Sequence, residues 1–283
     1  MNQKQKKNSI PDSSTGLYGI IGHPVAHSLS PVMHNSAFKA TGLNNVYLAF
    51  DVTDLEDAVK GIRALGIKGV SVTVPHKESV MKFLDEIDPV AKKIGAVNTI
   101  INRNGRLLGT NTDWIGAVKA LEEGAGRLDT KKVLVLGAGG SARAVVAGLT
   151  ERGARVLIAN RTLEKAKDLA EQFDARWYSF DELPDVEANI VVNTTSVGME
   201  PNQDTSLIPA ELLPKYPIVM DIVYSPLKTK LLKEAEATGC KTITGLRMLL
   251  FQAVAQFELW TGMQVPAEVM ERALYKTLKK SNE

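Results

Sequence analysis

An apolar segment that runs directly into a glycine-rich turn constrains the fold of this chain more than any other feature. Residues 133–136 are apolar, Gly137-Ala138-Gly139-Gly140-Ser141-Ala142 follows them, and residues 143–150 have a helical pattern. This is a G-x-G-x-x-A motif in a strand–turn–helix setting, in which the first glycine permits the turn, the second leaves room for a pyrophosphate and the alanine lets the helix approach the strand. Because helix N-termini attract anions, the segment predicts a dinucleotide site.

The end of the next expected strand indicates which dinucleotide is bound. An acidic residue about 20 positions after the glycines would bind the ribose 2′-hydroxyl of NAD. This strand instead ends in Asn160-Arg161-Thr162, with Lys165 one turn further on. These groups suit the 2′-phosphate of NADP, although Thr162 can also cap the following helix and Arg161 can be a solvated surface charge. The absent carboxylate favours NADP.

Alternating apolar and amphipathic segments predict an α/β fold. From residue 17 to residue 84 they follow a βαβαβα order, with a strand at 69–74 and a helix at 77–84. Two further strands, 97–101 and 107–109, flank the hairpin dipeptide Asn104-Gly105, so this first sheet should be mixed. A second series begins at residue 132 and has the doubly wound pattern. We therefore expect an N-terminal mixed-sheet α/β substrate domain and a Rossmann-like NADP-binding domain, with a cleft between them.

The same pattern suggests domain boundaries. We expect a mobile tail over residues 1–15, a substrate-binding catalytic domain over 16–112 and the Rossmann domain over 113–245. Residues 246–283 should form helices that return to the catalytic domain. The segment 246–260 is interrupted by polar side chains and is too short to span a bilayer, so a buried helix is expected and a membrane location is not.

Composition favours small-molecule chemistry. The 34 basic and 32 acidic residues give a net charge of +2 and are spread along the 283-residue chain, so no basic face for nucleic acid is predicted. Cys240 is the only cysteine, which excludes an internal disulfide and suits a reducing, cytoplasmic compartment. The polar, Lys-rich start has no signal-peptide pattern.

The four histidines have no metal-ligand spacing, so no metal is expected. The expected state is a monomer or homodimer.

Three polar segments outside the nucleotide motif carry candidate site residues. Ser30 before Pro31 suits a helix N-cap, while Ser28 and Ser30 together also suit a substrate carboxylate. In the second segment, Thr73 precedes Lys77, which is expected at a helix N-terminus, where the dipole and partial burial would lower its pKa toward a useful acid/base value. A solvated surface lysine is the alternative.

The third segment, Gly109-Thr110-Asn111-Thr112-Asp113, precedes a helix. Asp113 suits an N-cap, but four consecutive polar side chains at a domain junction also suggest a binding surface. Asn98 lies in an apolar strand, where a buried amide without partners would be costly, so we expect it to face a polyol.

The order of these segments resembles that of the shikimate dehydrogenase family. The similarity runs from about residue 17 to residue 262, through Ser-Leu-Ser-Pro, Val-Thr-Val-Pro-His-Lys, Gly-Ala-Val-Asn-Thr, Asn-Thr-Asp, Gly-Ala-Gly-Gly, Asn-Arg-Thr, Asn-Thr-Thr-Ser-Val-Gly-Met, Asp-Ile-Val-Tyr-Ser-Pro and Met-Leu-Leu-Phe-Gln. It implies reversible NADPH-dependent reduction of 3-dehydroshikimate, in aromatic amino-acid biosynthesis. A quinate/shikimate dehydrogenase with relaxed substrate and cofactor choice and a non-catalytic sensor on the same fold are the alternatives.

The resemblance also implies roles for particular residues. Lys77 and Asp113 would form the catalytic pair, with Lys77 stabilising or protonating the ketone oxygen. The other implied substrate contacts are Ser28, Ser30, Thr73, Asn98, Tyr224 and Gln252. The cofactor site would gain Thr194, Ser196 and Gly245.

Two positions depart from the family pattern. Ser71 stands where an asparagine is usual, and Arg247 stands where a small residue is common. If the strand continues to residue 74, Ser71 and Thr73 share a face and lie about 6 to 7 Å apart. Ser71 should then influence the choice between shikimate and quinate.

Overall fold

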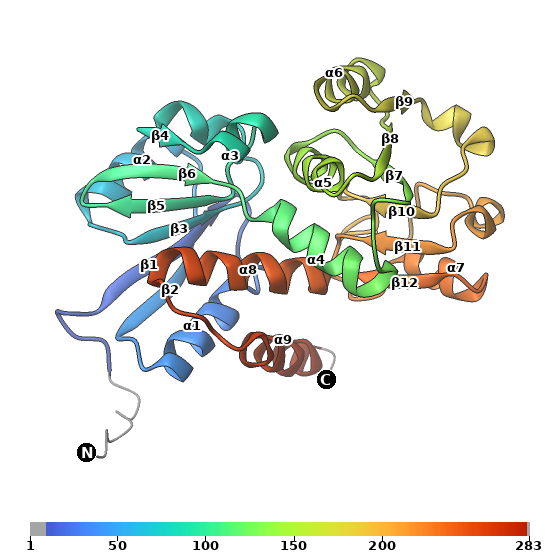
Figure 1. Ribbon diagram of the computed structural model, residues 1–283. Helices are drawn as coiled ribbons and strands as arrows, with labels where there is room; N and C mark the ends of the chain where they lie inside the picture. The colour runs from blue at the N-terminus through green and yellow to red at the C-terminus, as the bar shows by residue number, and fades with distance from the viewer. Residues whose placement is uncertain (1–9, 282–283) are drawn as a thin grey trace. The chain divides into compact units, whose positions relative to one another are not determined.

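The computed structural model describes residues 10–281, which fall into two compact units. The first unit takes in the chain up to Thr112 and from Ala253 onward, and the second takes in Asp113–Gln252. Each unit contains one six-stranded sheet. Figure 1 shows helices that cover the sheet in each unit. Residues 1–9 of the expected tail lie outside the described residues, whereas Thr15 donates a hydrogen bond to Asn44 at 2.9 Å. Among residues 10–281, no helix is long and apolar enough to cross a membrane.

The sheet of the first unit has the strand order β2-β1-β3-β5-β6-β4 and is mixed, as predicted. Its strands are β1 (Gly16–Gly22), β2 (Asn45–Asp51), β3 (Gly69–Val72), β4 (Glu86–Ile87), β5 (Thr99–Arg103) and β6 (Arg106–Thr110). Strand β5 is antiparallel to both β3 and β6. The expected hairpin joins β5 to β6, and Asn104 (φ 54°) and Gly105 (φ 91°) both have the positive φ that a tight hairpin requires.

Helices cover the sheet of the first unit with two sets of apolar contacts. The helical segments are α1 (Ser30–Thr41), α2 (Leu55–Ala64), the 3₁₀ helix η1 (Ser79–Phe83), α3 (Pro89–Ile94), the second half of α8 (Gly245–Thr261) and α9 (Ala267–Ser281). Val59 of α2 and Val80 of η1 belong to one core with Ile100. Aromatic rings form the other set, in which Phe38 of α1 packs against Phe257 of α8, with ring centroids 5.5 Å apart.

The sheet of the second unit is parallel and has the order β12-β11-β10-β7-β8-β9. Its strands are β7 (Lys132–Leu136), β8 (Arg155–Ala159), β9 (Arg176–Tyr178), β10 (Ile190–Asn193), β11 (Ile218–Asp221) and β12 (Lys241–Thr244). Counted from β7, this is the 3-2-1-4-5-6 order of the doubly wound dinucleotide fold. The predicted fold class is therefore confirmed. The order reverses between β7 and β10, and ligands of open α/β sheets bind at such a point.

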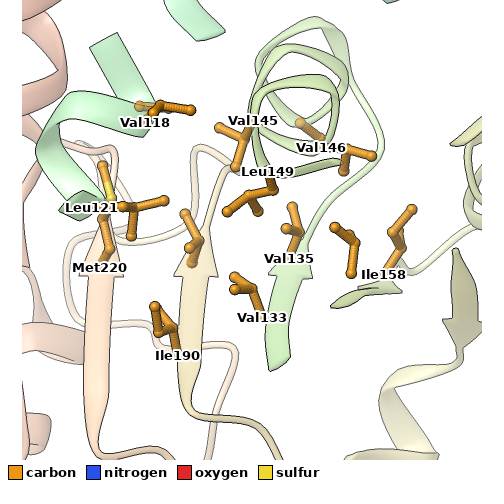
Figure 2. Packing of buried hydrophobic residues seen from close by; sticks show 14 of the residues in the cluster. Val118, Leu121, Val133, Val135, Val145, Val146, Leu149, Ile158, Ile190 and Met220 are labelled. Atoms are coloured by element: carbon orange, nitrogen blue, oxygen red, sulfur yellow. The ribbon is translucent and has the colours of Figure 1, made fainter. Parts of the chain in front are cut away.

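Apolar strands and helices bury the core of the second unit. The helical segments are α4 (Asp113–Ala125), α5 (Gly140–Glu151), α6 (Leu163–Phe173), the 3₁₀ helices η2 (Phe180–Asp185) and η3 (Ala210–Lys215), α7 (Lys230–Ala237) and the first half of α8. Figure 2 shows Val145 and Leu149 of α5 facing Val133 and Val135 of β7. All four side chains are fully buried, so the turn between β7 and α5 is held by a packed core.

The structure corrects three local expectations in the first unit. Strand β3 ends at Val72, two residues early, because the chain turns where His76 N–H donates to the Thr73 carbonyl at 2.9 Å. Val74 is consequently 64% exposed and does not join the buried valines. The helix expected at 77–84 is the short η1, and Lys77 lies in the turn before it. Ser30 is the first residue of α1 and does not cap it, since Leu29 occupies the N-cap position.

Candidate active site

The glycine turn lies where the strand order of the parallel sheet reverses. Gly137 follows β7 and has φ of 114°, a conformation that L side chains rarely adopt. A Cβ there would also lie 2.7 Å from Oγ1 of Thr194, which follows β10. Thr194 in turn donates to the Leu136 carbonyl at 2.6 Å. The Thr194 hydroxyl is therefore held against the glycine turn by its hydrogen bond to the end of β7.

The N-terminus of α5 suits a bound anion. Gly139 is the N-cap residue, so no side chain caps the first N–H groups of the helix. A Cβ on Gly139 would meet no protein atom within 4 Å, and its φ of −85° is ordinary. Neither packing nor backbone strain requires glycine here, so the open space fits the close approach of a pyrophosphate. Ala142 is completely buried against the sheet, as the motif predicts.

The residues expected to bind the 2′-phosphate cluster after β8. Asn160 donates from Nδ2 to the Thr162 carbonyl at 2.8 Å, which shapes the turn. Thr162 occupies the N-cap position of α6, but its hydroxyl makes no capping hydrogen bond. Arg161 and Lys165 are exposed, and among the described residues neither forms an ion pair. Both cations therefore fit an incoming phosphate.

A buried carboxylate holds the loops that follow β10 and β11. Asp221 Oδ1 accepts from Asn193 Nδ2 and Val223 N–H, both at 3.0 Å, and Oδ2 accepts from the Thr229 hydroxyl at 2.7 Å. Burial raises the pKa of Asp221 to about 6, against the effect of these three hydrogen bonds. The loop after β10 carries Thr194 and the exposed Ser196, and the loop after β11 carries Tyr224, whose pKa burial also raises.

Helix α8 begins against the second of these loops. A Cβ on Gly245 would lie 2.2 Å from the Ile222 carbonyl oxygen, so glycine is required by close backbone packing. Further along α8, Gln252 is buried and donates from Nε2 to the Leu249 carbonyl at 2.8 Å. Close packing against the Ile222 carbonyl therefore explains glycine at position 245, whether or not this residue contacts the cofactor.

The two serines expected to bind a carboxylate lie at the start of α1. Ser28 Oγ accepts from the Ser30 backbone N–H at 3.3 Å. Ser28 is partly exposed and Ser30 is buried. Burial raises the pKa of Tyr47, whereas a contact with the Ser30 side chain opposes the shift.

Thr73 directly follows β3, and Lys77 lies in the turn before η1. The Thr73 methyl group packs over Gly22, where a Cβ would come within 2.3 Å of it. The Lys77 carbonyl accepts from Val97 N–H at 2.8 Å, which ties the turn to the segment before β5. Both side chains are partly exposed. Asp113, the second proposed catalytic residue, is the first residue of α4 and is buried.

Asn98 lies just before β5 and finds its partners within the protein. Its Oδ1 accepts from the Thr112 backbone N–H and from the Thr99 hydroxyl, both at 2.7 Å, and its Nδ2 donates to Thr112 Oγ1 at 3.0 Å. The carbonyl end of Asn98 therefore needs no polyol as a partner, because the neighbouring threonines satisfy it, and the contact of Asn98 with the substrate stays a prediction.

Sequence reasoning singled out Ser71 but missed its buried partners, Tyr47 and Gln256, and the nearby His34. Ser71 is buried, accepts from the Tyr47 hydroxyl at 2.6 Å and donates to Gln256 Oε1 at 2.9 Å. Its influence on the choice between shikimate and quinate stays a prediction. His34 is fully buried and stacks on Tyr47 with centroids 4.5 Å apart, and neither ring nitrogen has a hydrogen-bond partner among the described residues. Burial lowers the pKa of His34 to about 3, whereas a contact with Gln256, outside hydrogen-bonding geometry, opposes the shift. The available signal was Gln256 itself, a polar residue one turn after Gln252 in an apolar helix.

Three family models match the chain. The substrate binding domain of shikimate dehydrogenase matches residues 20–100, the shikimate/quinate 5-dehydrogenase model matches 119–202, and the C-terminal domain of shikimate 5′-dehydrogenase matches 245–275.

Individual relatives match over nearly the full chain. Shikimate dehydrogenase (NADP(+)) of Pyrococcus abyssi is 49% identical over 93% of this chain and 99% of its own length. A crystal structure of a shikimate dehydrogenase in complex with NADP+ is 46% identical, has a TM-score of 0.88, and the match covers 95% of this chain and 98% of that one. The Thermus thermophilus enzyme in complex with NADP(H) and shikimate is 42% identical, with a TM-score of 0.86, over 92% of this chain and 99% of that one. The chain therefore belongs to the shikimate dehydrogenase family of NADP-dependent oxidoreductases.

Proposed function

We propose that this protein interconverts 3-dehydroshikimate and shikimate with NADP(H), in the biosynthesis of aromatic amino acids. The observation that carries the proposal is the near-complete match to relatives of that name, together with the retention of Lys77 and Asp113. The two alternatives, an enzyme with relaxed quinate and NAD use and a non-catalytic sensor, are not favoured by these relatives.

The proposed cofactor site is the edge of the parallel sheet where β7 and β10 end. The uncapped N-terminus of α5 would hold the pyrophosphate, with residues from Gly137 to Ala142 around it. Arg161 and Lys165 would bind the 2′-phosphate with Asn160 and Thr162, since charge-assisted contacts are the strongest available to an exposed phosphate. Thr194, Ser196 and Gly245 would complete the site. NADPH supplies the hydride in the reduction.

The proposed catalytic pair acts on the oxygen of the reacting carbon. Lys77 stabilises or protonates the oxygen as negative charge develops there, and Asp113 orients the resulting hydroxyl. The turn at Lys77 is fixed through its own carbonyl, which accepts from Val97 N–H, so the backbone that carries the ammonium group is held in place.

The proposed substrate residues supply two kinds of contact. Ser28 and Ser30 offer hydroxyls to the carboxylate at the start of α1. The ring hydroxyls would meet Thr73, Asn98 and Gln252, and Tyr224 would help to enclose the ring.

Domain limits, assembly and location complete the proposal. We assign substrate binding to residues 16–112 and the C-terminal helices, and cofactor binding to residues 113–245. The protein would act as a monomer or homodimer in the cytoplasm, where its lone Cys240 stays reduced.

The purified protein tests the activity directly. Absorbance of reduced nicotinamide is followed with shikimate or quinate, each with NADP or NAD. Turnover with shikimate and NADP far above the other three combinations is expected. Comparable turnover with quinate and NAD would favour the relaxed enzyme, and no turnover with any pair would favour the sensor.

A further inference from the structure

A line of buried polar side chains runs through the first unit behind Asn98. Tyr47 OH donates to Ser71 Oγ at 2.6 Å, and Ser71 donates to Gln256 Oε1 at 2.9 Å. Gln256 Nε2 then donates to Thr99 Oγ1 at 2.9 Å, and Thr99 donates to Asn98 Oδ1 at 2.7 Å. All five side chains are less than 5% exposed. They come from β2, β3, α8 and the start of β5, so only the folded unit brings them together.

The hydrogen bonds of this line fix the direction of the Gln256 amide. Because Ser71 donates to Oε1, Nε2 is the end of Gln256 that faces β5, where it also donates to the Asn98 backbone carbonyl at 3.2 Å. Thr99 Oγ1 accepts from Gln256, so its single hydroxyl proton is directed to Asn98. A chain of donors and acceptors that all point the same way polarises its members and strengthens each bond.

The line in turn fixes the direction of the Asn98 side chain. Oδ1 receives protons from the Thr99 hydroxyl and the Thr112 backbone N–H, so the carbonyl end faces the protein. The Nδ2 group donates one proton to Thr112 Oγ1 at 3.0 Å, so a ring oxygen that meets this side chain would meet the same Nδ2 end and must act as an acceptor. If the carboxamide rotated by half a turn, Oδ1 and Nδ2 would exchange places. The Thr99 hydroxyl and the Thr112 backbone N–H would then both point their protons at the NH₂ group, which is itself a donor.

We propose that Thr99 and Gln256 are positioning residues for substrate recognition: they hold the Asn98 carboxamide with its NH₂ end toward the substrate ring. The inference rests on the proposed function, in which Asn98 contacts a ring hydroxyl. It assigns no ligand contact to Thr99 or Gln256 themselves, whose polar atoms are used within the protein. It also gives Ser71 a role, because the Ser71 hydroxyl sets which end of Gln256 faces Thr99.

A Thr99→Val variant tests the proposal with almost no change in side-chain volume. It removes the hydroxyl that orders Asn98, and one net hydrogen bond corresponds to about a fivefold change in an equilibrium constant. We expect KM for shikimate to rise about five- to thirtyfold, with kcat and KM for NADP changed less than about twofold, because a contact made equally in the bound and transition states changes KM alone. Thr99→Ser, which restores the hydroxyl, should recover most of the shikimate affinity.

The control is Thr41→Val, in α1 of the same unit. The Thr41 hydroxyl donates only within its own helix, to the carbonyls of Ala37 and Phe38 at 2.8 and 3.3 Å. Its removal should leave KM for shikimate unchanged. If Thr99→Val does not fold, Gln256→Met, which keeps the length of the side chain and loses the amide, is measured instead and should raise KM for shikimate in the same way.

Four results separate this inference from the proposed function. No turnover of shikimate by the wild-type protein overturns the proposed function and the inference with it. Normal wild-type turnover with an unchanged shikimate KM in Thr99→Val or in Gln256→Met overturns only the inference. A parallel rise in KM for shikimate and NADP, or a Thr99→Ser variant as impaired as Thr99→Val, also overturns it, because general loosening of the fold would act in that way.

Discussion

Replacing the buried carboxylate of Asp221 should destabilise the second unit strongly. The side chain is fully buried and accepts three hydrogen bonds, from Asn193, Val223 and Thr229. In Asp221→Ala all three donors lose this acceptor. A buried donor left without a partner costs about 1 to 3 kcal/mol. Asn193 Nδ2 keeps a second acceptor, the Val197 carbonyl at 3.2 Å, so the expected loss is about 3 to 5 kcal/mol.

The pH dependence of this loss has a definite sign. Burial raises the pKa of Asp221 in the folded protein to about 6, above its ordinary value of 3.8. The folded state therefore binds a proton in this interval that the unfolded state has released, and the stability contributed by that proton declines as pH rises from 3.8 through 6. The whole interval corresponds to about 3 kcal/mol. Wild type and Asp221→Ala should thus differ more at the acidic end of the interval than at neutral pH.

Urea unfolding at several pH values measures both effects. Trp114 and Trp177 lie in the second unit and report its unfolding by fluorescence. Asp204→Ala is the matched control, because Asp204 is an exposed carboxylate of the same unit. A loss below about 1 kcal/mol at the acidic end of the interval would show that the three donors find other partners, since it falls at the level of a single ordinary hydrogen bond. A difference that widens toward neutral pH would refute the raised pKa.

Three further outcomes test the proposed site. Lys77→Ala should lower kcat about 10²- to 10⁴-fold while NADP titrations change little, and near wild-type turnover would exclude Lys77 as the catalytic group. Arg161→Ala should weaken binding of NADP by about 1.5 to 3 kcal/mol more than binding of NAD, whereas equal losses in calorimetric titrations would assign Arg161 to the fold. Gly245→Ala places a Cβ 2.2 Å from the Ile222 carbonyl oxygen and should cost about 1 to 3 kcal/mol in unfolding free energy; an unchanged melting temperature would contradict that packing.

The local pattern of the sequence determined the doubly wound unit. The apolar run before Gly137, the glycines and the following helix are contiguous, so the strand, turn and helix could be assigned without any distant contact. The same holds for the hairpin at Asn104 and Gly105, where the dipeptide itself supplies the required φ angles. Residues that depend on short-range chemistry were therefore predictable.

The limits of individual elements were less predictable. Alternating valines predicted a strand to residue 74, but a turn hydrogen bond from His76 to Thr73 ends β3 at Val72 and leaves Val74 exposed. The preference of valine for strands is weak compared with backbone hydrogen bonds and tertiary packing, so the pattern alone could not place this end. Because β3 ends at Val72, Thr73 lies outside the strand, and Ser71 and Thr73 do not share a strand face as predicted.

Only the tertiary structure decided how the polar residues behind Asn98 are satisfied. Ser71 is 24 residues from its partner Tyr47 and 185 from its partner Gln256. The sequence indicated that Asn98 and Gln256 were polar residues in apolar settings, but a local pattern carries no information on which distant donor meets which acceptor. Burial makes every such pairing necessary, because an unpaired polar atom in the core is costly, and the packing of α8 against the first sheet selects the pairs.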